Sequence, residues 1–179
     1  LAKVKAEVDH PVVLGLYIRG DAAWLDRTID EAEAAGCHAI AIVTEAPYYS
    51  RRERDLLARF RSRGSKAGTY RETQRALRGD GTADETAAAE ARMLPARLTW
   101  ETIDRIRKRT RLPIVLKGIA SADDARRAVD HGVAAIYVSN HGGRQLDCAE
   151  GSVEALPEVV DAVRGRAEVI VDGGIYRGT

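Results

Sequence analysis

The chain alternates between short apolar runs and longer stretches in which apolar side chains recur every three or four residues. The short runs predict buried strands, and the three-to-four spacing predicts helices with one apolar face. We expect about five strands, over residues 12–18, 39–43, 113–117, 135–139 and 169–172. A regular alternation of strand and helix builds right-handed units around a parallel sheet, so the pattern places the chain in the α/β class.

Residues that favour helix ends mark the helices expected between these strands. A short polar side chain can accept a hydrogen bond from a free N–H at the start of a helix, and glycine readily adopts the left-handed conformation at its end. The predicted caps are Asp21, Thr99 and Ser121, for helices over 22–35, over 100–110, and up to about Gly132. A further helix is expected over 152–164, closed by Gly165.

Two architectures fit this alternation, an open doubly wound sheet and a closed (β/α)₈ TIM barrel. The open sheet usually carries a G-x-G-x-x-G turn after a strand, and the sequence has none. Each predicted strand instead leads into a polar side chain, as barrel enzymes do at the carboxyl ends of their strands; these are Tyr17, Glu45, Lys117, His141 and Asp172. We therefore expect one partial barrel domain over 1–179, with about five of the eight strands and more chain on either side.

The segment over 51–97 interrupts the alternation as a long insertion in a βα loop. Residues 51–78 hold ten Lys or Arg and three Asp or Glu, which is compatible with a nucleic-acid or anionic-membrane surface. Phe60 and Tyr70 are the aromatic residues of that stretch, too few for stacking on bases. We expect a solvated excursion without nucleic-acid binding, and peripheral membrane association is the alternative.

Charge and cysteine usage narrow the remaining classes. The formal net charge is +1, which argues against a chain built around a polybasic arm or an acidic tail. Apolar runs such as 39–43 are far shorter than the ~20 residues that cross a bilayer. Cys37 and Cys148 have no metal-ligand spacing, and two isolated thiols are typical of a reducing compartment. We expect a cytoplasmic protein without a metal site.

Four side chains near strand ends could share one site. Lys117 supplies a cation that can face an anionic ring or phosphate, and His141 lies in a glycine-rich turn where backbone can approach a ligand closely. Arg144, three residues later, offers a planar fork that suits a carboxylate. Asp172, followed by two glycines, can accept hydrogen bonds from hydroxyl groups. Together these groups predict a site for an anionic small molecule at the barrel mouth.

The same residues carry a family resemblance. The nonapeptide S-N-H-G-G-R-Q-L-D over 139–147, with L-K-G before it and D-G-G after it, closely resembles the FMN-dependent L-2-hydroxy acid oxidases and dehydrogenases. That family includes glycolate oxidase, lactate oxidase, mandelate dehydrogenase and flavocytochrome b2. The segments around Leu16-Tyr17, over 41–52 and over 98–100 are similar to it as well. Another phosphate-binding barrel, such as an isomerase, would fit the fold but not the nonapeptide.

The resemblance implies oxidation of an (S)-2-hydroxy acid to a 2-oxo acid. His141 would be the base that takes a proton from the substrate, and Glu45 falls where the family has an Asp that orients this histidine. Arg144 would bind the substrate carboxylate with Arg52 as a second cation, and Tyr17 would hydrogen-bond a substrate oxygen. Reduced flavin would pass electrons to oxygen, a quinone or a cytochrome. Homo-oligomers, commonly tetramers, are expected.

FMN is the cofactor that the resemblance implies. Lys117 would lie by the N1–C2 carbonyl edge of the flavin, and the cofactor would also be lined by Ser139, Asp172, Gly173 and Gly174.

Three positions depart from the family pattern. Gly15 and Val43 replace a Gln and a Thr that contact the flavin, and Tyr176 replaces a phosphate-binding Arg. These changes support an alternative, a non-catalytic barrel relative that acts as a binding module or partner subunit.

Overall fold

A computed structural model describes residues 1–18, 21–45, 57, 98–146 and 148–177. Its sheet contains five parallel strands in the order in which they occur along the chain. They are β1 (Val13–Leu16), β2 (Ala39–Val43), β3 (Ile114–Ile119), β4 (Ala135–Val138) and β5 (Glu168–Val171). Each strand thus pairs with the next one along the chain, in register from Val13 opposite Ala39 to Val138 opposite Val171. The predicted strands are confirmed, with β3 reaching two residues further.

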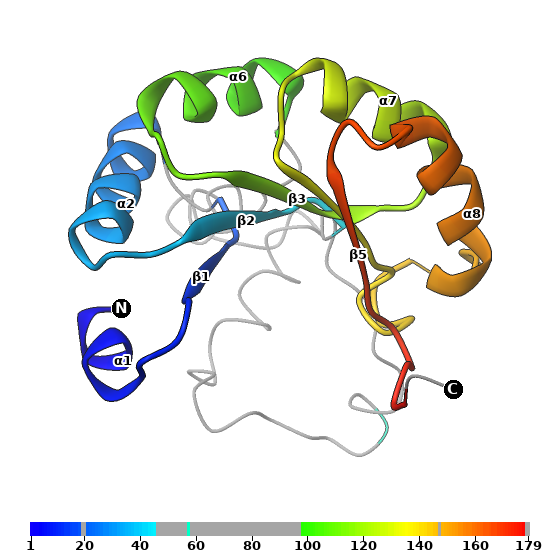
Figure 1. The fold of residues 1–179 in the computed structure, drawn as a ribbon, viewed down its shortest axis with the longest axis horizontal. Coiled ribbons are helices and arrows are strands. Elements are labelled where there is room, and N and C mark those ends of the chain that lie inside the picture. Colours follow the sequence, from blue (N-terminus) through cyan, green and yellow to red (C-terminus); the bar gives the residue numbers. More distant parts are fainter. Residues whose placement is uncertain (19–20, 46–56, 58–97, 147, 178–179) are drawn as a thin grey trace, which may run out of the picture.

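The helices that connect the strands cover one side of the sheet. These are α2 (Ala22–Ala34), α6 (Trp100–Arg109), α7 (Ala122–Asp130) and α8 (Ser152–Val163). Figure 1 shows them as an outer arc around a curved sheet. A doubly wound sheet would have helices on both faces and a strand order that reverses. Sequential order with one helical layer is instead the arrangement of a barrel wall, as the strand-end pattern predicted.

Alternating side chains give the sheet two different faces. The outer face packs on the helices through a core that includes Ile40, Ile42, Leu116, Ile136 and Val138 from the strands. The inner face carries smaller residues, namely Ala39, Ala41, Val115 and Ala135, with Tyr137 packed against them. Successive residues of a strand point to opposite faces, so the same apolar run supplies both layers.

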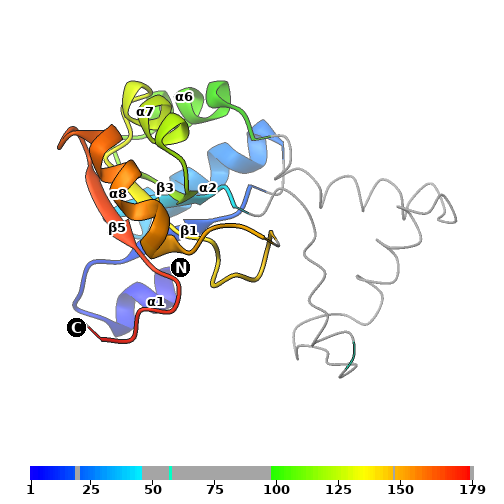
Figure 2. The same ribbon diagram turned by 90° about the vertical axis from the view of Figure 1, so that its right-hand side faces the viewer.

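Helix α1 (Ala2–Glu7) stands apart from this outer layer. It has no buried residue, and Lys5 Nζ donates to the His10 carbonyl at 3.2 Å just before β1. Figure 2 shows α1 on the opposite side of the sheet from α6 and α7. In the described part of the chain, no helix has both the length and the apolar character needed to cross a bilayer.

Helix caps explain where the connecting helices begin. Asp21 Oδ1 accepts from the Trp24 N–H at 2.7 Å, and Ser121 Oγ accepts from the Asp124 N–H at 3.2 Å, so both predicted caps are confirmed. Thr99 occupies the cap position of α6 without a side-chain bond to the free N–H groups. Thr99 is therefore the first-turn cap residue that the sequence predicted, but its hydroxyl lies 3.4 Å from the Thr102 hydroxyl instead of accepting from a backbone N–H.

Candidate active site

Polar side chains from β2, β3, β4 and β5 meet at one edge of the sheet. All strands are parallel, so their carboxyl ends lie at the same edge, where functional groups of barrel enzymes gather. The structure brings together four residues predicted from the sequence. Glu45 follows β2, Lys117 lies near the end of β3, His141 follows β4 and Asp172 follows β5. Ser139, also predicted, joins them from the residue directly after β4.

The Glu45 carboxylate links the predicted base to the predicted cofactor cation. Its side chain is only 7% exposed, and the same oxygen, Oε1, accepts from Lys117 Nζ and from His141 Nδ1, the latter at 2.8 Å. A histidine whose Nδ1–H donates to a carboxylate carries its lone pair on Nε2. The pair therefore orients the imidazole and sets the tautomer that can accept a proton.

Gly118 provides the space in which this carboxylate lies. Residue 118 has φ +104, and a Cβ added there would lie 2.6 Å from the backbone nitrogen of Glu45 and closer still to its carboxylate. The strand ends are locked together beside it, because the Thr44 N–H and hydroxyl both donate to the Lys117 carbonyl at 2.8 Å. Glycine is required at 118 by both conformation and close approach.

A left-handed turn presents His141. Residues 141, 142 and 143 have φ values of 60, 68 and 67, and His141 is the one that is not glycine. The His141 N–H donates to Ser139 Oγ at 3.2 Å, and the Gly143 N–H donates to Asn140 Oδ1 at 3.0 Å. Non-glycine residues in this conformation are strained and persist where the surrounding structure holds them, commonly at functional sites.

Ser139 and Asp172 complete the surroundings of the Lys117 ammonium. Ser139 is almost fully buried, and its Oγ accepts from Lys117 Nζ at 2.7 Å. Asp172 Oδ2 lies 3.8 Å from the same nitrogen. Residues 173 and 174 follow with φ +102 and +84, and a Cβ at Gly173 would lie 2.6 Å from the Ser152 hydroxyl. The predicted D-G-G turn thus needs its first glycine for close packing.

Several buried polar atoms in this region have no hydrogen-bond partner among the described residues. They are Glu45 Oε2 and Asp172 Oδ1 at the strand ends, with Gln145 Oε1 and Ser152 Oγ nearby. Buried polar atoms are normally satisfied, so such atoms at a ligand site indicate a group that arrives with the ligand. A polyol chain supplies hydroxyl donors, and an electron-rich ring edge suits the Lys117 ammonium. The donor and acceptor set therefore fits FMN.

Other predicted residues lie around this centre or beyond the described part. Tyr17 follows β1, and its ring meets the His141 ring edge-on, with centroids 6.4 Å apart. Arg144 is exposed in the His141 turn and makes no ion pair with another described residue. Arg52 and the insertion over 51–97 lie outside the described residues.

The three departures from the family pattern differ in their surroundings. A Cβ at Gly15 would meet nothing within 4 Å, so the position leaves open space on the inner side of β1. Val43 is buried at the end of β2, whereas Tyr176 is 94% exposed.

Tyr137 is a site residue that the sequence did not reveal. It lies on β4 directly opposite Lys117, and Lys117 Nζ is 5.3 Å from the centre of its ring. The signal was present in the alternation, since Tyr137 and Ser139 are two residues apart on one strand and its extension. Tyr137 was hidden because it belongs to a run that was interpreted as a uniformly buried strand.

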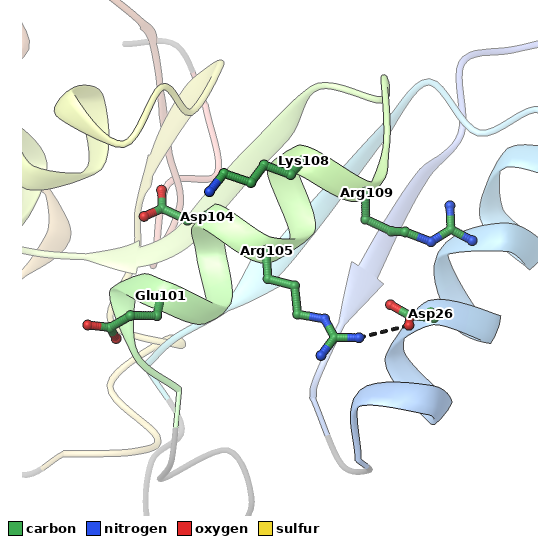
Figure 3. Close-up of a pocket in the computed structure, with 6 residues that line it drawn as sticks. All are labelled: Asp26, Glu101, Asp104, Arg105, Lys108 and Arg109. Carbon is green, nitrogen blue, oxygen red and sulfur yellow. Dashed lines mark hydrogen bonds and ion pairs between the residues drawn. The ribbon is translucent and has the colours of Figure 1, made fainter.

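An open groove on the outer surface is separate from this site. It lies between α2 and α6 and is lined by Asp26, Glu101, Asp104, Arg105, Lys108 and Arg109 (Figure 3). Arg105 pairs with Asp26 at 2.8 Å, and Arg109 pairs with Asp30. The groove combines three acids with three bases, so it is a charge-balanced seam between two helices rather than a reaction centre.

Comparison with known proteins agrees with this geometry. The family model described as FMN-dependent dehydrogenase matches residues 1–179. The chain is 45% identical to 4-hydroxymandelate oxidase of Amycolatopsis orientalis, over 99% of this chain and 50% of that protein. It is 42% identical to L-lactate oxidase of a Nostoc species, over 92% of this chain and 46% of the relative. Human 2-hydroxyacid oxidase 1 is 39% identical, over 93% and 46%.

Solved structures give the same result. A mandelate oxidase variant with 4-Br-2-hydroxy-methylphenylacetate superposes with a TM-score of 0.78 at 38% identity, covering 99% of this chain and 47% of that one. A mandelate oxidase mutant that holds an FMN adduct gives 0.77 at 40% identity, with the same coverage. The chain spans about half the length of the relatives it matches. It belongs to the FMN-dependent dehydrogenase family, and its five strands are part of that family's barrel.

Proposed function

We propose that the full-length protein oxidises an (S)-2-hydroxy acid to a 2-oxo acid with FMN as its cofactor. The single observation that carries this proposal is the buried Glu45 carboxylate, whose Oε1 accepts from both His141 Nδ1 and Lys117 Nζ. One carboxylate oxygen thus orients His141, so that its other nitrogen can accept a proton, and holds the Lys117 ammonium, which can contact an electron-rich ligand. Relatives named 4-hydroxymandelate oxidase and L-lactate oxidase support the same class of reaction.

Proton transfer is assigned to His141. Glu45 holds the Nδ1–H, so Nε2 can take a proton from the substrate, and the carboxylate stabilises the imidazolium that results. Histidine is the side chain that enzymes use most often for general acid–base catalysis. FMN, when bound, accepts the two electrons that leave the substrate.

Binding is divided between the two sides of this centre. On the substrate side, Arg144 and Arg52 are proposed to bind the carboxylate, and Tyr17 to donate a hydrogen bond to a substrate oxygen. On the cofactor side, Lys117 and Ser139 are proposed to hold the ring edge. Asp172, with the glycine turn behind it, is proposed to accept from the ribityl hydroxyls. The unpartnered Asp172 Oδ1 supports this assignment.

The buried pair also argues against a binding module without catalysis. A carboxylate buried against an imidazole and an ammonium costs desolvation free energy, and simple ligand binding gives no reason to bear that cost. The residues that differ from the family pattern, Gly15, Val43 and Tyr176, lack the polar groups that would contact the cofactor. The contacts of Glu45 with Lys117 and with His141 are both present. Oxygen is the electron acceptor we propose, because the named relatives are oxidases.

A histidine substitution tests the assignment in the full-length protein. We expect His141→Gln to lower kcat by at least about 10²-fold while FMN stays bound, because glutamine cannot exchange a proton at neutral pH. Turnover with mandelate, lactate and glycolate is followed by oxygen uptake, and bound FMN by visible absorption.

His38→Gln is the matched control. His38 is exposed and directly precedes β2, at the opposite end of that strand from Glu45, so the same substitution there should leave turnover unchanged. Unchanged turnover in His141→Gln would refute the base assignment. Loss of FMN together with turnover in His141→Gln would assign the residue to cofactor binding instead.

A further inference from the structure

Tyr137 lies on the inner face of the sheet, on β4, the neighbour of the edge strand β5. In register it lies between Lys117 of β3 and Ile170 of β5, and its ring packs on the small apolar cluster of Ala39, Ala41, Val115 and Ala135. The alanines leave room for a large ring in this layer. The aromatic side chain therefore lies directly beside the strand ends that carry the polar site.

The ring of Tyr137 is one wall of the Lys117 ammonium site. Lys117 Nζ is 5.3 Å from the ring centre, within the range of a cation–π interaction. Glu45 Oε1 and Ser139 Oγ accept hydrogen bonds from the same nitrogen. The ammonium is thus held by a carboxylate, a hydroxyl and an aromatic face, each from a different residue.

Asp172 lies two residues beyond Ile170, the partner of Tyr137 on β5, and its N–H donates to the Val138 carbonyl at 3.1 Å, so Asp172 lies next to Tyr137 on the same face of the sheet. Burial raises the pKa of the Tyr137 hydroxyl, and the negative charge of Asp172 and a hydrogen bond to that carboxylate raise it further. The Lys117 ammonium acts in the opposite direction, and Glu45 adds to the rise. A hydroxyl with a raised pKa stays protonated and remains a donor to Asp172.

The spacing of Lys117 and Asp172 shows what this arrangement achieves. Lys117 Nζ and Asp172 Oδ2 are 3.8 Å apart, too far for a direct hydrogen bond, which requires about 2.7–3.2 Å. Asp172 Oδ1 is buried without a partner among the described residues. Lys117 and Asp172 thus form an ion pair without a direct hydrogen bond, and the Lys117 ammonium donates to Glu45 Oε1 and Ser139 Oγ instead.

We propose that Tyr137 is a positioning residue for the cofactor, holding the Lys117 ammonium with its ring and the Asp172 carboxylate with its hydroxyl so that both remain available to FMN. This inference rests on the proposed function, because it takes FMN as the ligand of Lys117 and Asp172. Groups held in their binding geometry before the ligand arrives lower the free-energy cost of binding. Tyr137 acts through these two residues rather than on the substrate.

Two substitutions in the full-length protein separate the two contacts. Tyr137→Phe keeps the ring and loses the hydroxyl, and we expect the Kd for FMN to rise about tenfold, since one charge-assisted hydrogen bond is lost. Tyr137→Leu also removes the aromatic face, for a further rise of about fivefold. Titration of the apoprotein with FMN, followed by quenching of flavin fluorescence, gives both values. Tyr176→Phe, which removes a hydroxyl from an exposed ring, should leave the Kd unchanged.

A second readout needs no flavin. The alkaline absorbance titration of the apoprotein, taken as the difference between the wild type and Tyr137→Phe, gives the ionisation of Tyr137 alone. We expect this tyrosine to ionise above the ordinary value of about 10, and Asp172→Asn to move it back toward that value. Thermal unfolding of each variant checks that the protein is folded.

Each outcome has one meaning. A high ionisation that falls in Asp172→Asn, together with weaker FMN binding in both Tyr137 variants, supports the inference. If Tyr137 ionises at the ordinary value for a tyrosine, the contact with Asp172 is refuted whether or not FMN binds. Unchanged FMN affinity in both variants overturns the positioning role and leaves Tyr137 as packing. A wild-type protein that binds no FMN but shows the high ionisation refutes the proposed function, and this inference with it.

Discussion

Glu45 shows how one side chain can serve two neighbours from different strands. It extends from just beyond β2, and its carboxylate meets Lys117 at the end of β3 and His141 beyond β4. The family resemblance places an aspartate here, and the extra methylene of glutamate is accommodated over Gly118. The longer side chain therefore keeps the contact with the histidine, at 2.8 Å.

Gly118→Ala should disrupt this arrangement. The new Cβ would meet both the backbone and the carboxylate of Glu45 in a conformation that favours glycine. We expect a loss of about 1–3 kcal/mol in the free energy of unfolding. A misplaced Glu45 should also lower kcat about 10²-fold. Urea denaturation and steady-state kinetics measure the two effects.

Gly165→Ala is the control for backbone strain alone. Residue 165, beyond the end of α8, has φ +70, but a Cβ there would meet nothing within 4 Å. We expect it to lose about 1 kcal/mol of stability with little change in kcat. Equal losses of kcat in the two variants would show that strain, rather than the space for Glu45, accounts for the effect of Gly118→Ala.

At the residue scale, the sequence predicted the strand-end groups but not their supports. Glu45, Lys117, His141 and Asp172 follow apolar runs, and parallel strands bring such positions together. The need for Gly118 depends on a φ value and a contact across strands, neither of which a local pattern contains. Tyr137 required the register of β3 against β4, which side-chain alternation alone does not establish.

At the scale of elements, a histidine joins α6 to the end of α7. His131 Nδ1 lies 2.8 Å from Asp104 Oδ1, and the His131 ring stacks on Trp100 with centroids 4.9 Å apart. The hydrogen bond from His131 lowers the pKa of the Asp104 carboxyl. Two successive βα units are thus connected on the outer surface, away from the site.

This link predicts a pH-dependent contribution to stability. Folding lowers the pKa of Asp104, so its carboxylate stabilises the folded state above its ordinary pKa of about 4, and the contribution is lost as pH falls through lower values. Asp104→Asn should therefore lower Tm at about pH 6 and have less effect at about pH 3. Asp104 is exposed, so the change in Tm should be small.

Thermal unfolding by circular dichroism checks this expectation, with Asp161→Asn as its control. Asp161 is exposed on α8 and pairs with no described residue, so its substitution should leave Tm almost unchanged at both pH values. An effect of Asp104→Asn that stays constant across this pH range would contradict the assignment.

The positions of helices and strands were the features most fully predicted from the sequence. The caps at Asp21 and Ser121 could be predicted because a short polar side chain just before a helix can accept a hydrogen bond from a free backbone N–H of its first turn. Thr99 also marks the start of α6 as predicted, although its hydroxyl contacts the Thr102 hydroxyl and not a free backbone N–H. β3 extends to Ile119, two residues beyond the predicted strand, because Gly118 continues the strand with an irregularity in the pairing.

At the scale of the whole molecule, the five strands form an arc with two free edges in the described part of the chain. β1 and β5 each pair with one described strand, and β2, β3 and β4 each pair with two. Inner-face residues at the edges, Val13 and Ile170, are 50% and 41% exposed, whereas those at the centre are buried. The barrel was predictable from the alternation of strands and helices, the absence of a G-x-G-x-x-G turn and the polar strand ends, because all three are properties of the linear sequence.

The free edges predict a gradient of amide hydrogen exchange. In residues 1–179 expressed alone, β1 and β5 should exchange fastest and β3 slowest, because β3 is hydrogen-bonded on both sides and lies furthest from both free edges. In the full-length protein, we expect exchange at β1 and β5 to slow by at least about tenfold as further strands pair with them. Mass spectrometry of peptides from each strand measures the difference. Equal protection of all five strands in the isolated segment would contradict the arc.

The pairing of β2 with β3 has a consequence for the order in which the protein folds. Glu45 and Lys117 are 72 residues apart, whereas Lys117 and Ser139 are 22 apart. Closing a loop about three times longer costs about 1 kcal/mol more conformational entropy. We expect β3, β4 and β5 to associate early and β2 to join them late. The catalytic connection between Glu45 and His141 would then form as that slowest junction closes, so activity should be regained with the last phase of refolding.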